Sequence, residues 1–242
     1  MSCRPDTVRI AYRPRPGSRA VYRVVVSAAA VTTVADQPPR HTSDEEVFTA
    51  THEVLEANPS GSRVRVELVS QGAEARTYVV RLDRAAQLAE VQLVEGLPAS
   101  ALGDLGLSEI FPAAAAAPPT RPLRPGDRWR LDAPISLAGA TTRIAGTGRI
   151  TSLGVIGGRD VVRIESSYRL PIDRTTDSSR LVGSESTVST ATRRLDDGTI
   201  ESETATTTAT YSLSVLPPKG TTGPVIPGAL SVRIQSRTTR IR

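Results

Sequence analysis

The chain has 242 residues, of which 38% are hydrophobic, so it can form a buried core and is not expected to be globally disordered. Its net charge is +5, but Lys219 is the only lysine, and the arginines alternate with acids as they do on solvated strand faces. No basic run is interleaved with aromatic side chains, so we do not expect nucleic-acid binding. The preference for arginine, alanine, valine and proline is typical of a GC-rich, actinobacterial-type genome.

The first fifteen residues are polar and contain Cys3, the only cysteine, which excludes an internal disulfide and a cysteine-based metal site. The sequence contains no apolar run long enough for a membrane-spanning helix and no signal-peptide pattern. Residues 1–15 are expected to form an N-terminal tether like the one that follows the lipidated cysteine of a bacterial lipoprotein. Cys3 is therefore a lipidation candidate that would attach the protein to a membrane. An exposed thiol on a cytoplasmic protein is the alternative; we favour the extracytoplasmic, membrane-anchored location.

Residues 16–95 alternate apolar and polar side chains with a period of two, which predicts antiparallel strands. Five strands are expected, over residues 18–34, 44–57, 62–70, 76–84 and 87–96. The sequence Asn-Pro-Ser-Gly at 58–61 predicts a tight turn between the second and third strands. This segment is interpreted as a first β-meander.

Residues 96–125 lack the strand period and form the predicted connector. Their leucines and alanines favour one or two short helices, which Pro118 and Pro119 would end. Pro125-Gly126-Asp127 is expected to be a turn that directs Trp129 into the core. Phe111 and Trp129 are expected to be buried together, so this connector is interpreted as a strap over one domain rather than as a linker between two.

Residues 126–242 again alternate apolar and polar side chains with a period of two, and they are interpreted as a second meander. Gly157-Gly158 and Asp196-Asp197-Gly198 predict hairpin turns, because glycine tolerates the positive φ that such turns require. Between residues 204 and 210 the even positions are all threonine, and we expect them on the solvated face. The alternate positions would form an apolar inner face: Ala205, Ala209, Tyr211, Leu213 and Val215.

The two meanders resemble each other, since "RPGSRAVYRV" at Arg15 echoes "RPGDRWRLDA" at Arg124, and "VRVEL" at Val64 echoes "VRIES" at Val162. Residues 1–242 are therefore predicted to be a single, mainly β domain. Its fold would be a strongly twisted antiparallel sheet or half-barrel of about ten or eleven strands, with a duplicated meander as a further option.

Catalytic chemistry finds little support in the sequence. No nucleophile elbow, phosphate-binding loop or dinucleotide fingerprint occurs, and His41 and His52 are the only histidines. His52 lies in an alternating strand pattern and is interpreted as a strand-face residue rather than a ligand. Carboxylate pairs could be drawn from Glu67, Glu165, Asp83 and Asp132, but any β-protein offers such pairs. We expect no enzyme activity, no catalytic residues, no metal and no cofactor.

The layout of two meanders around a proline-rich connector that ends in Pro125-Gly126-Asp127-Arg128-Trp129 resembles uncharacterised bacterial envelope β-proteins. Their architecture is similar to the clam-like LolA-type and mycobacterial LppX-type lipoprotein carriers. The resemblance implies a curved sheet with helices over its open face, a lipidated N-terminal cysteine and a lipid or hydrophobic ligand. It rests on few identical residues, and the short connector departs from the pattern of a full helical plug.

Two functions remain open. The first is binding of a hydrophobic or lipid-like ligand on the concave face of the sheet, which small and β-branched residues would leave roomy. The expected cavity lining is Leu102, Leu105, Ile110, Phe111, Trp129, Tyr211 and Leu213. The alternative is a structural or protein-interaction β-module without a small-molecule ligand, which would dock a partner, of unknown identity, through its sheet edges and Thr-rich hairpin.

Overall fold

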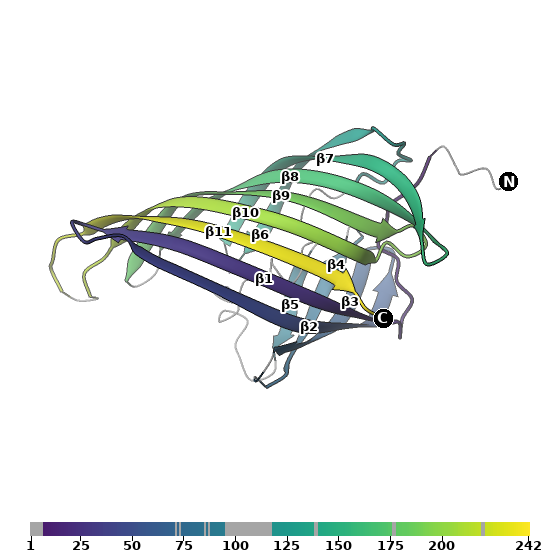
Figure 1. Ribbon diagram of the computed structural model, residues 1–242, viewed down its shortest axis with the longest axis horizontal. Coiled ribbons are helices and arrows are strands. Elements are labelled where there is room, and N and C mark those ends of the chain that lie inside the picture. Colours follow the sequence, from purple (N-terminus) through teal and green to yellow (C-terminus); the bar gives the residue numbers. More distant parts are fainter. Residues whose placement is uncertain are drawn as a thin grey trace.

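The computed structural model describes residues 7–242 except residues 71, 73, 85, 87, 95–117, 138–139, 176–177 and 219–220. Within these residues the chain forms eleven β-strands and no helix (Figure 1). The strands are β1 (Arg19–Val34), β2 (Arg40–Asn58), β3 (Gly61–Ser70), β4 (Arg76–Asp83), β5 (Leu88–Val94), β6 (Arg128–Leu137), β7 (Ala140–Ile156), β8 (Arg159–Thr175), β9 (Ser179–Arg194), β10 (Ile200–Val215) and β11 (Ile226–Arg240).

All eleven strands belong to one antiparallel sheet with the order β5-β4-β3-β2-β1-β11-β10-β9-β8-β7-β6. Each meander is therefore continuous, and the two meet where the first strand pairs with the last, from Tyr22 opposite Arg240 to Val34 opposite Gly228. The strands are long and the sheet curves strongly (Figure 1). The prediction of an open, mainly antiparallel sheet of about ten or eleven strands is confirmed.

The core lies on one face of this sheet, which we call the inner face. Directly opposed residues on antiparallel neighbours share a face, so the registers extend the inner face from strand to strand. One core cluster is built mainly from β1 to β4 and includes Tyr22, Val24, Val64 and Val80. A second is built from β6 to β8 and includes Trp129, Ile150 and Ile164. Both clusters lie toward the end of the sheet at which β1 and β6 begin.

That end is crossed by residues 8–14, which we call the N-terminal strap. Its backbone makes hydrogen bonds to three separate parts of the fold. These are the reciprocal pair between Val8 and Leu123 (2.8 Å each way), Tyr12 N to Arg84 O (2.8 Å) and Arg13 N to Asp197 O (2.7 Å). Residues 8–14 had been assigned to an N-terminal tether, but they are part of the fold, whereas residues 1–6, including Cys3, lie outside the described part of the chain.

The side chains of the N-terminal strap join the two core clusters. Val8 and Ile10 are buried in the cluster of β6 to β8, and Tyr12 is buried in the cluster of β1 to β4. The alternate residues are more accessible, since Arg9 and Arg13 are exposed and Ala11 is half-buried. The strap thus follows the period-two alternation of a strand, which the sequence analysis overlooked because the segment is short and rich in arginine and proline.

The turns that lead into β1 and β6, which we call the launching turns, have the same backbone structure. Gly17 (φ 77°) and Gly126 (φ 92°) both adopt a left-handed conformation that favours glycine. The Gly17 amide donates to Val54 O (2.7 Å), as the Gly126 amide donates to Ile150 O (2.8 Å). The ladder register also shifts directly after Val54 in β2 and after Ile150 in β7. The two meanders therefore begin as equivalent units.

At equivalent positions beside the two launching turns, the large residue lies on different strands in the two meanders. Each strand begins two residues after the glycine of its launching turn. The second residue of the strand is Ala20 in β1 but Trp129 in β6. Ala20 lies opposite His52, whereas Trp129 lies opposite Gly148. Each pair places one large ring beside one small residue, which keeps the packed volume similar.

The predicted connector of residues 96–125 is described only at its end. The expected helices fall almost wholly on residues 95–117, outside the described residues, and residues 118–125 contain no helix. The expected turn is confirmed: the Asp127 amide donates to Arg124 O (3.0 Å), and the Arg124 amide donates to the Asp127 carboxylate (3.0 Å). The bond from the Arg124 amide, and then one from the Arg121 side chain, hold the pKa of the Asp127 carboxyl below its usual value. Trp129, which follows the turn, is 8% exposed.

Substitution of Gly148 by Ala is expected to destabilise the protein by about 1–3 kcal/mol, because an added Cβ would overlap the Trp129 indole. Gly154→Ala on the same strand is the matched control, since its Cβ would meet only Val161 Cγ2 at an ordinary 3.6 Å. Denaturant unfolding of both variants measures the difference, and equal stabilities would contradict the packing described for Trp129.

Replacement of Tyr12 by Ala is expected to lower the free energy of unfolding by roughly 3 kcal/mol or more, since a buried ring that joins the strap to the core is lost. Arg9→Ala, at an exposed position of the same strap, should change stability by less than about 0.5 kcal/mol. Chemical denaturation should show one transition in both variants. Two separate transitions would contradict the single sheet-wide cooperative unit.

Candidate functional site

The inner face changes chemical character along the sheet. Next to the strapped end, β8, β9 and β10 place small hydroxyl-bearing residues on it instead of aliphatic ones. Ser166, Thr187 and Ser189 are all buried, at 7%, 4% and 4% exposure. Their hydroxyls bond across the strands, between Ser166 and Ser189 (2.8 Å) and between Thr187 and Thr207 (2.8 Å). We call this region the polar belt.

Glu203 is the most deeply buried acid of the polar belt, at 3% exposure. Burial raises its pKa to about 8, opposed by the positive charge of Arg193 and by a hydrogen bond with Ser189. Its Oε2 and the Thr238 hydroxyl opposite it have no hydrogen-bond partner within the described part of the chain. A protonated, neutral carboxyl tolerates such a position far better than an ionised one.

Arg193 carries the buried positive charge of the inner face. It is 3% exposed, and burial lowers its pKa, opposed by the carboxylates of Glu203 and Asp83. Asp83 ends β4 in the first meander, while Arg193 lies near the end of β9 in the second. The charge of Arg193 therefore couples the two halves of the sheet electrostatically, beside the N-terminal strap.

Beyond the polar belt, the inner face becomes aliphatic and is only half-buried. β11, the middle strand of the sheet, contributes Leu230, Val232 and Ile234, each of which retains intermediate exposure, with Ile234 opposite Thr207 of the polar belt and packed against the core cluster of β1 to β4. Their cross-strand partners on β1 are Thr32, Ala30 and Ala28. Leu213 of β10 and Leu181 of β9 continue the same surface. We call this half-buried region the aliphatic strip.

A carboxylate lies at the boundary between the polar belt and the aliphatic strip. Glu185 of β9 accepts a hydrogen bond of 2.6 Å from the Tyr211 hydroxyl. Burial, and then the bond to Glu185, raise the pKa of Tyr211, so its hydroxyl stays protonated as a donor. Glu185 itself is half-buried, between the buried residues Ala209 and Leu170.

The structure separates the predicted lining residues that it describes. Tyr211 and Leu213 lie on the inner face beside the aliphatic strip, as the alternation in β10 predicted. Trp129 packs instead in the core cluster of β6 to β8, with Leu123 and Ile150 among its neighbours. The remaining four, Leu102, Leu105, Ile110 and Phe111, lie outside the described residues.

The sequence analysis did not identify Glu203, Arg193, Glu185 or the buried serines as inner-face residues. The signal was weak because β9 and β10 carry Ser and Thr on both faces, so alternation alone cannot tell which face is buried. The pairing of β9 with β8, whose inner positions include Ile164 and Leu170, and of β10 with β9 supplies that information.

The histidines do not form a site. His52 is half-buried, and desolvation of its imidazole lowers its pKa to about 4. Its ring lies 4.9 Å from that of Tyr22, so it is a strand-face residue that packs beside the core. Among the described residues, no group of three or more His, Cys, Asp or Glu is placed to hold a metal ion.

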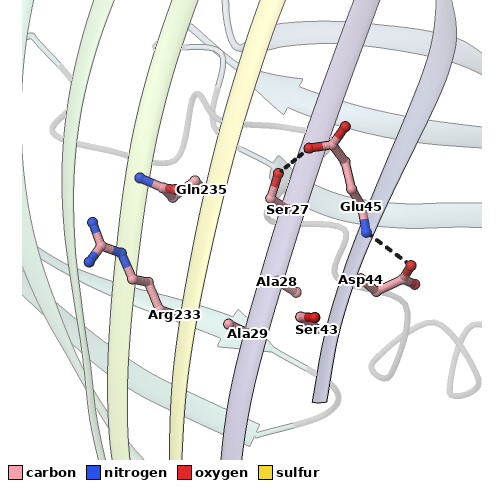
Figure 2. Close-up of a pocket in the computed structure, with 8 residues that line it drawn as sticks. All are labelled: Ser27, Ala28, Ala29, Ser43, Asp44, Glu45, Arg233 and Gln235. Atoms are coloured by element: carbon pink, nitrogen blue, oxygen red, sulfur yellow. Dashed lines mark hydrogen bonds between the residues drawn. The ribbon is translucent and has the colours of Figure 1, made fainter. Parts of the chain in front are cut away.

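A shallow hollow of about 430 Å³ lies elsewhere, over β1, β2 and β11 (Figure 2). Most of its lining residues lie on the outer face, among them Ser27, Glu45 and Gln235, which oppose one another. Ser27 Oγ donates to Glu45 Oε2 (2.9 Å). The hollow is open to solvent, so it is a weaker site candidate than the inner face.

Comparison with known proteins gives little further information. No protein-family profile and no curated protein matches the sequence. Among solved structures, the chain is similar to an outer membrane channel from Pseudomonas putida F1, with 9% identity, a TM-score of 0.26, and coverage of 95% of this chain and 98% of that one. No helix in the described residues is both long and apolar enough to cross a membrane.

Stability is expected to fall by about 1–2 kcal/mol between pH 6.5 and pH 8 because of Glu203. In this range the unfolded chain ionises the carboxyl, whereas the folded chain, with a pKa of about 8, keeps it protonated. Folding therefore binds a proton, and stability decreases as the pH rises. Glu203→Gln should flatten this dependence, as measured by urea unfolding across the pH range. An equal slope in both proteins would contradict a protonated Glu203.

Proposed function

We propose that the chain is a non-enzymatic envelope-type protein that binds a hydrophobic or lipid-like ligand on the concave inner face of its sheet. One observation carries this proposal: the middle strand of an eleven-stranded sheet leaves its inward aliphatic side chains half exposed. Inward residues of a central strand are ordinarily covered by a second layer. Apolar surface of this kind on a curved face favours an apolar ligand.

The adjoining features are consistent with ligand binding rather than catalysis. The polar belt consists of hydroxyls bonded to each other, and its buried acid is neutral at neutral pH, so neither offers an activated nucleophile. The resemblance to clam-like lipoprotein carriers supports the same function. Attachment to a membrane through a lipidated Cys3, and with it an extracytoplasmic location, remain part of this proposal.

A protein-docking module is the second candidate. On the outer face, Thr204, Thr208 and Thr210 are exposed as expected, and Val188 of the neighbouring strand is 63% exposed among them. The two edge strands, β5 and β6, are the further surface on which a strand of a partner protein could pair. Extraction of the purified protein with organic solvent separates the two candidates, because only the first yields a bound lipid.

Introduction of a charge on the aliphatic strip tests the proposed function directly. Val232→Asp is expected to reduce binding of a fluorescent fatty-chain probe by about tenfold or more, because an ionised group would be placed in the ligand's apolar contact surface. Ser231→Asp, one residue away on the outer face, should bind the probe like the wild type. Circular dichroism confirms that both variants fold. No probe binding by the wild type, or equal binding by both variants, would refute the proposal.

A further inference from the structure

The charged residues on the middle of the inner face are all acidic. Cross-strand registers place Glu203 in the row of Val24, Glu46 opposite Val26, Asp44 opposite Ala28, and Glu185 in the row of Ala30. On the described strands, the other inward positions of these four rows carry no formal charge. The inward arginines whose side chains are described lie outside them: Arg76, Arg193 and Arg240 are near the strapped end, and Arg40 is toward the far end.

Glu185 is the acid best placed to meet a ligand. Glu203 is wholly buried, and Asp44 and Glu46 lie in fully exposed positions of β2. Glu185 is half-buried and accessible, and the aliphatic strip begins beside it. Residues two apart on a strand are about 7 Å apart, so Leu181 on the same strand lies about 13 Å further along.

Tyr211 fixes the Glu185 carboxylate. Tyr211 lies opposite Gly183, two residues before Glu185 on β9, and Gly183 approaches the backbone of Thr210 and Tyr211 so closely that a Cβ would collide with it. The Tyr211 hydroxyl donates to Glu185 Oε1. That bond occupies one carboxylate oxygen and leaves the second as an acceptor on a residue whose cross-strand neighbours are Ala209 and Leu170.

We propose that the ligand is a cationic amphiphile, whose ammonium group binds Glu185 while its hydrocarbon chain lies along the aliphatic strip. This inference rests on the proposed function and specifies its ligand class. A half-buried carboxylate among apolar side chains is stabilised by a donor that carries positive charge, and such charge-assisted hydrogen bonds are the stronger ones. A carboxylate or phosphate head group would instead be repelled by the carboxylates of Glu185, Glu46 and Asp44.

The test is calorimetric titration at pH 7 with three ligands of equal chain length, dodecylamine, dodecanol and dodecanoate, each below the concentration at which it forms micelles. The wild type should bind the amine about tenfold or more tightly than the alcohol, and the dodecanoate most weakly. Glu185→Gln should reduce amine affinity to that of the alcohol and leave alcohol affinity unchanged. Tyr211→Phe, which keeps the ring, should lower amine affinity by a smaller factor.

Glu45→Gln is the matched control, because Glu45 lies on the outer face of β2 and bonds Ser27. It should bind all three ligands like the wild type. Equal binding of amine and alcohol by the wild type, or tightest binding of dodecanoate, would overturn the cationic ligand class and leave the proposed function intact. Binding of none of the three would overturn the proposed function itself.

Discussion

The hydrogen bonds of the N-terminal strap are the contacts on which the strapped end depends. A single open sheet has two distant edges, and within the described residues no second layer covers its inner face. The strap bonds Leu123, just before edge strand β6, and Arg84, just after β4, and its side chains enter both core clusters. The first and the second meander, which form the two walls of the curved sheet, are thereby held around a common core. The burial of Arg193, which lies near Tyr12 of the strap, depends on this closure.

Closure at one end also explains why the burial of the inner-face side chains decreases along the sheet. Near the strap, side chains from the two walls meet and exclude water, so polar groups there must bond to each other or lose their charge. Farther along, β1, β2 and β8 to β11 continue beyond the last residue of β3, and the inner aliphatic residues remain half exposed. The polar belt, Glu185 and the aliphatic strip follow one another along the inner face as burial decreases.

Much of the strand layout could be predicted, because period-two alternation and glycine turns are local signals. The turn at Gly126, the burial of Trp129 and the inward side chains of Tyr211 and Leu213 follow from such signals. The N-terminal strap could not be recognised, since its alternation at Val8, Ile10 and Tyr12 becomes meaningful only when distant strands pair with it. The acids of the inner face were missed for a related reason: their orientation depends on the register between strands, which no local pattern in a Ser/Thr-rich strand specifies.

The two equivalent units have taken different roles. After matching launching turns, the first unit fills its inner face with Val64, Val66 and Val80, which are fully buried and leave no room for a ligand. In the second unit, Gly148 gives space to Trp129, and Ser166 and Ser189 replace bulky residues on the strands that follow. Farther from the strap, the second unit contributes Leu181, Leu213 and the inward residues of β11, which remain half exposed. The unit with the smaller inward side chains is therefore also the one that carries most of the surface on which we propose that the ligand binds.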